Sequence, residues 1–574
     1  MAALAILRRV DTARGLSIKQ VSAAFARQSF KAPQVRRIGE STVCWFDSLH
    51  SSSQSPNWVE FETGFICCVG ELAYQRKRGR AALTALWHDY EKPGVSVPDD
   101  LYGNFHVVIQ NASGAWMFGD DLGLLQLFSS HDGQLLSTSW MSCLLLEPHR
   151  LLDRLATQDY ILNGASHGTS SIVSGITRVP TNYRLELATG VMEHADQRSW
   201  INQYEFASQA AAIDLVSATL IDRTSRCLGG DPAGLVTALS GGYDSRLILA
   251  ALNATQCPAD LFVYGKPNDE DVLIAQDLGR ALGEPVNVLD KSSIDSNQPE
   301  LGLAQVEANA LFFDGTPIDG LFDPGSDRLT RIRHAESAKL QLNGGGGEVF
   351  RNFFYLGSRS FSATELVRCF YHQFTRDVFP NRTSYDDYID STAANIARAV
   401  QNTSGVLSRT EVEAVYPLFR VRDWTSRTNS IVARYGRYYT PLVDPILVRQ
   451  ALALPMHWKN FGRFEGQLIN TLSPTLGSRP LSYGFTPASG PDLTYQIKMT
   501  LQHARTPSLR GLTPSIKRAL GRSGSTDRPQ APGWLQTAEP IDEIVRIENI
   551  RSEPQLKRAF SVMALMKVFG LTLR

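Results

Sequence analysis

The segment from Gly234 to Leu282 alternates between apolar runs and helical runs, and this order restricts the fold more than any other feature. The apolar runs are Gly234 to Leu239 and Ala259 to Tyr264, and the helical runs that follow them are Ser245 to Leu252 and Val272 to Leu282. Strand, helix, strand and helix at this spacing predict an α/β fold with a parallel sheet and helices on its faces. Beyond about residue 360 the pattern is typical of helices.

The turn between the first strand and the first helix reads Ser240-Gly-Gly-Tyr-Asp244-Ser245. Two glycines let the backbone approach a phosphate closely, and the following helix presents unpaired N–H groups and the positive end of its dipole. The serine hydroxyls can donate hydrogen bonds to pyrophosphate oxygens, and Asp244 can hold magnesium, which prefers hard oxygen ligands. No Gly-Lys-Ser/Thr follows, so this is not a Walker A loop. A tight turn without a ligand is the alternative interpretation.

This turn resembles the SGGxDS loop of the asparagine synthetase family and related ATP pyrophosphatases. The resemblance implies a domain that uses ATP and Mg²⁺, releases pyrophosphate and leaves AMP on an acceptor. Asn343 to Phe350 is similar to the family's second glycine-rich loop, with Gly347 where the family has a metal-binding aspartate, so that Glu348 would supply the carboxylate. The nucleotide-binding residues implied are Leu239, Ser240, Gly241, Gly242, Asp244, Ser245, Gly344, Gly345 and Gly346, and the metal ligands are Asp244 and Glu348.

Three later segments resemble the family in the same order. Tyr439 to Asp444 is similar to the family's Arg-x-Pro-Phe-Leu-Asp, with tyrosine in place of arginine. Arg479 to Pro487 matches the stretch that ends in Gly-Phe-x-x-Pro, where the family commonly has a lysine. None is present, so Arg479 is assigned as a catalytic residue with Asp244 and Glu348. Residues 269–271 are acidic, as in the family at this point, or they cap the next helix.

The N-terminal half has short apolar or alternating segments broken by turn residues, which predicts a mostly β region. Residues 99–105, Gly119 to Gly123 and Ser174 to Pro180 resemble landmarks of the class II glutamine amidotransferase domain. The resemblance implies an Ntn-type αββα sandwich over residues 1–205. The ATP-pyrophosphatase domain, with a helical C-terminal part, would then cover residues 206–574.

A glutaminase of this class uses a cysteine exposed after removal of Met1, whose α-amino group also serves as the base. This chain has Ala2 at that position, and Val69 stands where the family's Asn-Gly-Glu segment has its asparagine. We therefore predict an inactive glutaminase, and the amine must come from elsewhere. Relatives that lack the cysteine include β-lactam synthetases and lasso-peptide macrolactam cyclases. The all-glycine second loop fits the cyclases better.

These observations predict an ATP-dependent carbon–nitrogen ligase that adenylates a carboxylate and lets an amine capture it, with macrolactam formation on a peptide as the leading reaction. The expected partners are a carboxylate substrate and a precursor peptide with its leader-binding protein or protease. One alternative is an asparagine synthetase or tailoring amidotransferase that uses free ammonia. Another is a non-catalytic nucleotide-binding regulator. Tyr355 and Glu336 are considered as general bases because they flank the second loop.

The overall charge is balanced, with 57 lysines and arginines against 57 aspartates and glutamates, and gives no reason to expect nucleic acid or a membrane as the partner. The seven cysteines lack zinc-ligand spacing and are expected to be reduced core thiols of a cytoplasmic protein. The basic, Pro-, Gly- and Ser-rich stretch from Arg505 to Arg528 is interpreted as a solvated loop, or as a loop that closes over an anionic substrate or a peptide.

Overall fold

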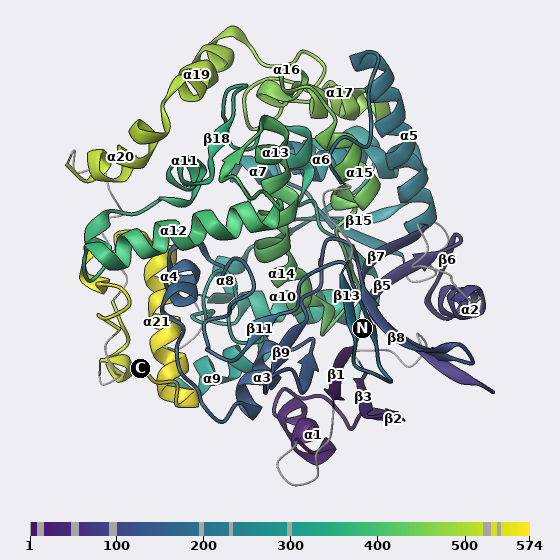
Figure 1. The fold of residues 1–574 in the computed structure, drawn as a ribbon. Helices are drawn as coiled ribbons and strands as arrows, with labels where there is room; N and C mark the ends of the chain where they lie inside the picture. The colour runs from purple at the N-terminus through teal and green to yellow at the C-terminus, as the bar shows by residue number, and fades with distance from the viewer. Residues whose placement is uncertain are drawn as a thin grey trace.

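Two antiparallel sheets form the N-terminal half of the computed structural model, which describes residues 2–8, 16–47, 57–90, 100–194, 200–228, 234–295, 301–519, 530–536 and 541–573 (Figure 1). The first sheet has the order β11 (Thr177–Arg178), β9 (Phe128–Ser130), β10 (Leu135–Ser137), β1 (Ala3–Arg8), β3 (Ser41–Phe46), β2 (Gln34–Ile38). The second has the order β13 (Met192–His194), β12 (Tyr183–Glu186), β8 (Gly114–Gly119), β7 (Leu101–Asn111), β5 (Gly64–Tyr74), β4 (Trp58–Phe61), and β6 (Lys77–Arg78) also pairs with β5.

The pleat of these strands explains the layers, because successive side chains point to opposite faces of a sheet. In β1, Leu4 and Ile6 contribute to a core shared with the second sheet, whereas Ala5 and Leu7 belong to the core that contains helices α1 (Ile18–Ala26) and α3 (Trp140–Leu146). Helix α2 (Gly79–Tyr90) packs on the other side of the second sheet. The mostly β character predicted for this half is confirmed.

A five-stranded parallel sheet carries the second half of the chain. Its order is β16 (Val286–Leu289), β15 (Ala259–Tyr264), β14 (Leu235–Ala238), β17 (Leu340–Leu342), β20 (Tyr438–Tyr439). Helices α6 (Tyr243–Ala254) and α7 (Glu270–Leu282) follow β14 and β15, as the alternation of the sequence predicts. The mixed α/β class with a parallel sheet is therefore confirmed.

The chain reverses its direction of travel across this sheet at β14. From β14 it moves to β15 and β16 on one side and then returns to β17 on the other side of β14. In open parallel sheets, ligands bind at such a switch point, beyond the carboxyl ends of the strands. The turn after β14 and the loop after β17 are the two glycine-rich segments, so the fold brings both to this position.

Helices make up most of the remainder, as predicted beyond residue 360. The longer ones are α4 (Arg154–Asn163), α5 (Gln209–Leu228), α9 (Leu303–Phe312), α10 (Ser326–Glu336), α12 (Arg382–Ala399), α13 (Arg409–Val415), α14 (Ser426–Ala433), α15 (Pro445–Leu452), α17 (Arg463–Leu472), α19 (Leu493–Ala504), α20 (Pro507–Ala519) and α21 (Glu553–Phe569). Within the described ranges, no helix combines the length and the apolar character needed to span a membrane.

The loop predicted over Arg505 to Arg528 is wrong for residues 507–519, which form α20. The helix tolerates Pro514 in its interior and packs against the short helical segment Val367–Tyr371. Arg510 donates a hydrogen bond from Nη1 to the carbonyl of Phe354 at 2.9 Å. The packing of α20 therefore stabilises a helix where the prolines and glycines of the sequence predicted a loop. Residues 520–529 lie outside the described residues.

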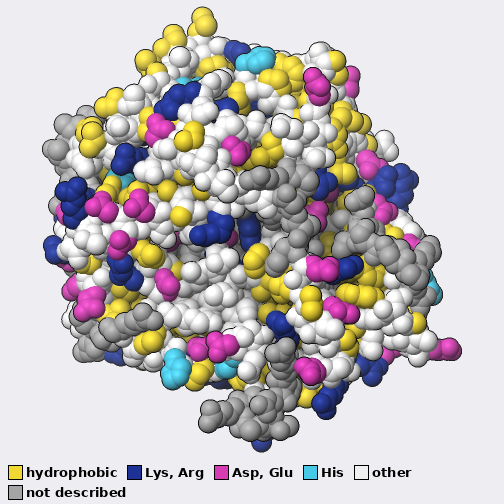
Figure 2. Space-filling model, viewed as in Figure 1, with side chains coloured by type: hydrophobic (Ala, Val, Ile, Leu, Met, Phe, Trp, Pro, Cys, Tyr) yellow, Lys and Arg dark blue, Asp and Glu magenta, His cyan; other side chains and the backbone are white. Residues whose placement is uncertain are grey.

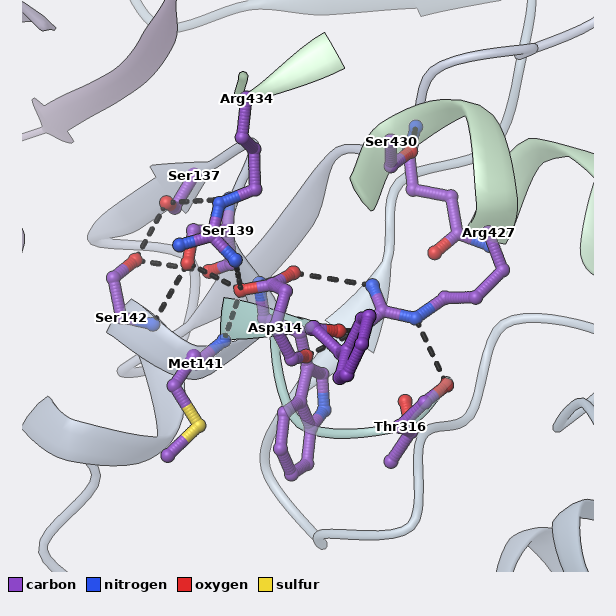
Figure 3. Close-up of polar contacts among 12 residues, drawn as sticks. Ser137, Ser139, Met141, Ser142, Asp314, Thr316, Arg427, Ser430 and Arg434 are labelled. Atoms are coloured by element: carbon purple, nitrogen blue, oxygen red, sulfur yellow. Dashed lines mark hydrogen bonds and ion pairs between the residues drawn. The ribbon is translucent and has the colours of Figure 1, made fainter. Parts of the chain in front are cut away.

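A buried aspartate joins the two halves of the chain (Figure 3). Asp314 accepts hydrogen bonds from the Ser139 hydroxyl at 2.6 Å and from the Met141 N–H at 2.9 Å, so it caps α3 from a distant part of the chain. Arg427 Nη1 and Arg434 Nη1 lie 3.1 and 3.5 Å from its carboxylate oxygens. Burial alone would raise the pKa of Asp314, but the two guanidinium groups outweigh it and hold the pKa below its usual value.

Candidate functional site

The turn after β14 brings two serine side chains together at the start of α6. The Ser240 N–H donates to Ser245 Oγ at 3.0 Å, and the two serine hydroxyls lie 3.0 Å apart. Gly242 stands at the N-cap of α6, where no side chain caps the helix. The first N–H groups of α6 therefore keep their capacity to bind a negatively charged group.

Gly241 is required at its position because three neighbours surround it. A Cβ there would lie 2.9 Å from Asp271 Oδ1 and 2.9 Å from Ser482 Cβ. The Gly241 N–H donates to Asp271 Oδ1 at 2.8 Å, and its carbonyl accepts from the Ser482 N–H at 3.0 Å. The turn is thus clamped between the first residues of α7 and the 479–487 stretch.

The acidic run 269–271 combines two roles. Asp269 occupies the N-cap of α7, but its side chain accepts from the Lys266 N–H at 2.7 Å and makes no capping bond to the helix. Asp271, in the first turn of α7, instead accepts the hydrogen bond from the Gly241 N–H in the turn after β14. Asp271 is therefore a structural support of the turn after β14.

The second glycine-rich loop packs directly on the first. A Cβ on Gly344 would lie 3.2 Å from Ser245 Cα. Gly346 has φ 103°, a conformation that favours glycine, and its N–H donates to Glu348 Oε2 at 3.2 Å. Glu348 also accepts a hydrogen bond of 2.5 Å from Tyr416 Oη, at the start of the π-helical segment Tyr416–Thr425.

Asp244 and Glu348, the predicted metal ligands, lie in one cluster with two residues that the sequence did not reveal. Arg351 Nη2 lies 2.6 Å from Asp244 Oδ1 and 3.8 Å from Glu348 Oε1. Its Nε lies 2.9 Å from Oε2 of Glu465, a fully buried residue of α17. The geometry assembles three carboxyl groups around one guanidinium.

The charge balance of this cluster is set by burial. Burial raises the pKa of Asp244 to about 6, with Arg351 opposing the rise and Glu348 adding to it. Burial also raises the pKa of Glu465 well above its usual value. Arg351 would lose affinity for its proton through burial, but the carboxylates outweigh this and raise its pKa.

Gly347 explains how the cluster fits together. A Cβ at this position would lie 2.6 Å from Asp244 Oδ1 and 2.8 Å from Glu465 Oε1, closer than real Cβ atoms approach. A side chain at this position would not fit between the two carboxyl groups without displacing one of them.

The donor set suits Mg²⁺ only together with phosphate oxygens. No group of three or more His, Cys, Asp or Glu is arranged to hold a metal ion in the part of the chain that the structure describes. Mg²⁺ is usually bound by one or two carboxylates together with substrate phosphates. Asp244 and Glu348 supply two carboxylates beside the turn after β14, but both contact the Arg351 guanidinium, a cation that Mg²⁺ would have to displace.

Arg479 lies at a different part of the site. Its side chain is 43% exposed and its Nη1 lies 3.6 Å from Asp277 Oδ1 on α7. Its backbone is held by Arg246, a fully buried residue of α6 that donates to the carbonyls of Arg479 and Pro480 at 2.6 Å. The predicted catalytic role of Arg479 stays a prediction.

The remaining candidates are placed apart from the cluster or serve the fold. Asp444 caps α15 through the Ile446 N–H at 2.9 Å and pairs with Arg223 Nε at 3.3 Å. Glu336 ends α10, at the amino end of β17 and thus opposite the second loop. The ring of Tyr355 lies 5.9 Å from that of His503 on α19.

Ala2, the position that the amidotransferase resemblance assigns to the nucleophile, lies in a packed core. Ala2 is 1% exposed and belongs to the core between the two sheets with Trp45. Glu71, beside Val69, is engaged by Arg78 Nη2 at 2.5 Å and by Arg437 Nε at 2.9 Å. Asp99 of the 99–105 landmark lies outside the described residues.

The described cysteines are mostly buried thiols, as predicted. Burial raises the pKa of Cys44 and of Cys143 to about 12, and it raises that of Cys369 to about 11. Cys67 and Cys68 lie in β5, and burial raises their pKa further. Such thiols remain protonated and are poor nucleophiles.

No protein-family model matches the chain, and no curated protein matches it significantly. The resemblance to the asparagine synthetase family therefore remains a proposal that depends on the motifs and their geometry.

We expect Gly347→Ala to lower activity at this site, because the added Cβ would push Asp244 and Glu465 apart and small displacements of reacting groups cost about 100-fold in rate. The measurement is ATP–pyrophosphate exchange. Gly357→Ala is the matched control, since a Cβ added to Gly357 would meet no neighbouring atom within 4 Å. Equal rates in the two variants would contradict the close packing of the cluster.

Proposed function

We propose that this chain is an ATP-dependent ligase that activates a carboxylate as its adenylate and joins it to an amine. The carboxylate oxygen attacks the α-phosphorus, the bond to the β-phosphate oxygen breaks and pyrophosphate leaves. The amine then attacks the acyl carbon, loses a proton, and AMP leaves. The observation that carries the proposal is the meeting of both glycine-rich loops and the Asp244 cluster at the switch point of the parallel sheet.

Each part of the site has a role in this scheme. Ser240, Ser245 and the first N–H groups of α6 would bind the departing pyrophosphate, because the two hydroxyls lie together beside a helix N-terminus that no side chain caps. Asp244 and Glu348 would hold Mg²⁺, which when bound neutralises the phosphate charge. Within the described part of the chain, the Arg351 guanidinium contacts both carboxylates and would add positive charge beside the departing pyrophosphate.

The N-terminal half supports an amine source outside this chain. The layers of helix, sheet, sheet and helix agree with the Ntn-type sandwich of the amidotransferase resemblance. Among the described residues, Ala2 lies in the core and burial raises the pKa of the Cys44 thiol, so neither side chain supports glutamine hydrolysis as the source of the amine. Capture by an amine of the same peptide, giving a macrolactam, is the reaction that we favour, with free ammonia as the alternative amine.

The test is ATP–pyrophosphate exchange over a panel of amino acids and candidate precursor peptides. We expect exchange with one carboxylate class, because adenylation is reversible while pyrophosphate is present. Product analysis with and without ammonium then separates macrolactam formation from amidation. Absence of exchange with every substrate would contradict the ligase.

The position of Arg351 favours one second candidate, a nucleotide-binding regulator. Its guanidinium occupies the centre of the carboxyl cluster, and a cation there opposes the binding of a second cation. Nucleotide binding that is independent of Mg²⁺, without pyrophosphate exchange, would identify this function.

A further inference from the structure

The Arg351 guanidinium contacts both of the carboxylates that are assigned to the metal. Its Nη2 lies 2.6 Å from Asp244 Oδ1 and 3.8 Å from Glu348 Oε1. The three side chains are only 19–28% exposed, so salt and solvent screen these contacts less than they screen contacts on the open surface. A positive charge of the chain itself therefore already neutralises the carboxylates that a divalent cation needs.

Both carboxylates are also supported by groups other than Arg351. Glu348 Oε2 accepts hydrogen bonds from the Tyr416 hydroxyl at 2.5 Å and from the Gly346 N–H at 3.2 Å. Asp244 lies in the first turn of α6, where its neighbours on both sides along the chain are buried. We therefore expect the two carboxylates to stay in place when the guanidinium moves, and to offer their oxygens to another cation.

Arg351 has further contacts that do not involve these two carboxylates. Its Nε lies 2.9 Å from Oε2 of Glu465, whose side chain is fully buried. Its guanidinium lies 5.6 Å from the centre of the ring of Tyr243, the first residue of α6. The turn that ends at this residue is the one in which the hydroxyls of Ser240 and Ser245 lie together. The guanidinium is thus anchored by Glu465 and placed beside the turn after β14.

A phosphate bound at this turn would change the balance of charge around Arg351. Guanidinium groups bind phosphate oxygens through paired N–H donors, as they bind carboxylates. Mg²⁺ and Mn²⁺ prefer to share carboxylate and phosphate oxygens. Without the phosphate, the guanidinium and the metal depend on the same two carboxylates and repel each other. With the phosphate, each cation has an anionic partner.

We propose that Arg351 is an internal competitor of the metal, which holds Asp244 and Glu348 until nucleotide phosphates bind at the turn after β14. Arg351 then leaves the two carboxylates for the phosphate oxygens, and the carboxylates become free to bind Mg²⁺. The metal therefore binds together with the nucleotide and only weakly before it. The role of the nucleotide rests on the proposed function, whereas the competition between Arg351 and a divalent cation does not.

The experiment titrates the full-length chain with Mn²⁺ alone and measures free Mn²⁺ by electron paramagnetic resonance. The test variants are Arg351→Met, which removes the charge, and Arg351→Gln, which removes the charge but keeps a hydrogen-bond donor. We expect weak binding by the wild type and binding about 10-fold or more tighter in both variants, because a positive charge beside the carboxylates is lost. Mn²⁺ should also raise the thermal midpoint of both variants more than that of the wild type.

Two controls assign the gained binding to this cluster. Glu348→Gln added to Arg351→Met should abolish the gain, since one of the two carboxylate ligands becomes a neutral amide. Arg27→Met should bind Mn²⁺ as the wild type does. Arg27 pairs with Glu307 at 2.9 Å, both side chains are at least 40% exposed, and it ends α1, at the opposite end of the molecule from α6 in Figure 1.

The surface charge makes this comparison a local one. Acidic and basic side chains are interspersed over the face shown in Figure 2, and the chain as a whole has 57 of each. The loss of one positive charge far from the cluster is therefore screened and should not attract Mn²⁺ to it. A gain that appears only in the Arg351 variants reports on Asp244 and Glu348.

Arg351 variants that bind Mn²⁺ no more tightly than the wild type would overturn the competition. Tight binding of Mn²⁺ alone by the wild type, lost in Glu348→Gln, would overturn it as well. Calorimetry with α,β-methylene-ATP in EDTA tests the second step on the same preparations. Binding should be about 10-fold weaker in Arg351→Met, because the phosphates lose a charged donor. Equal affinities would refute the move of Arg351 to the phosphate, whereas no nucleotide binding by the wild type would refute the proposed function and keep the competition.

Discussion

Asp244→Asn is expected to lower the rate of ATP–pyrophosphate exchange at least about 100-fold, since the loss of one preorganised electrostatic contact costs this much in other enzymes. The amide keeps the shape of the side chain but removes the charge that Asp244 shares with Glu348 around Arg351. The loss should appear in the maximal rate and in the Mg²⁺ dependence. Circular dichroism and a thermal melt of the same sample establish that the fold is intact.

The thermal midpoint should not fall in this variant. Because burial raises the pKa of Asp244 to about 6, its ionised form is less favourable in the folded chain than in the unfolded chain at neutral pH. A neutral amide removes this cost, and Arg351 keeps Glu465 as a partner. Asp260→Asn is the control, because Asp260 is an exposed residue near the amino end of β15, paired with Lys339. Exchange that survives in Asp244→Asn would refute the assigned site.

The loops of the site could be predicted from the sequence because their signals are local. Glycines, serines and an aspartate between an apolar run and a helical run specify a turn at the end of a strand, and the structure has that turn between β14 and α6. The second loop follows β17, and the parallel pairing of β14 with β17 places the two loops side by side. Local pattern and sheet topology were enough for this part.

Arg351 and Glu465 could not be predicted because their meaning depends on packing. Arg351 follows Glu348 by three residues, a spacing that permits contact on a helix but does not indicate it. Glu465 lies in α17, more than a hundred residues later, and reaches the cluster only because α17 packs against α6. From the sequence, Gly347 indicated only that Glu348 would supply the carboxylate, and the structure shows that a Cβ there would meet Asp244 and Glu465.

Asp314→Ala is expected to destabilise the protein by about 3–5 kcal/mol, the usual cost of removing one partner from a buried ion pair. The variant leaves Arg427 and Arg434 buried without their carboxylate and removes the acceptor of the Ser139 hydroxyl. The measurement is urea unfolding followed by circular dichroism. Asp387→Ala is the control: Asp387 pairs with Arg154 at 2.8 Å, both side chains are over 40% exposed, and such pairs contribute about 0–1 kcal/mol.

The Asp314→Ala experiment also tests whether the two halves of the chain unfold together. The predicted boundary at residues 205 and 206 stays a prediction, but one hydrophobic core contains Trp140 of the first half and Phe560 of the second. Asp314 ties α3 to this second half, so its loss should lower the unfolding midpoint of both halves in a single transition. If only the N-terminal half unfolded earlier, the two halves would be independent. A shared transition would mean that the two halves fold as one cooperative unit through their common core.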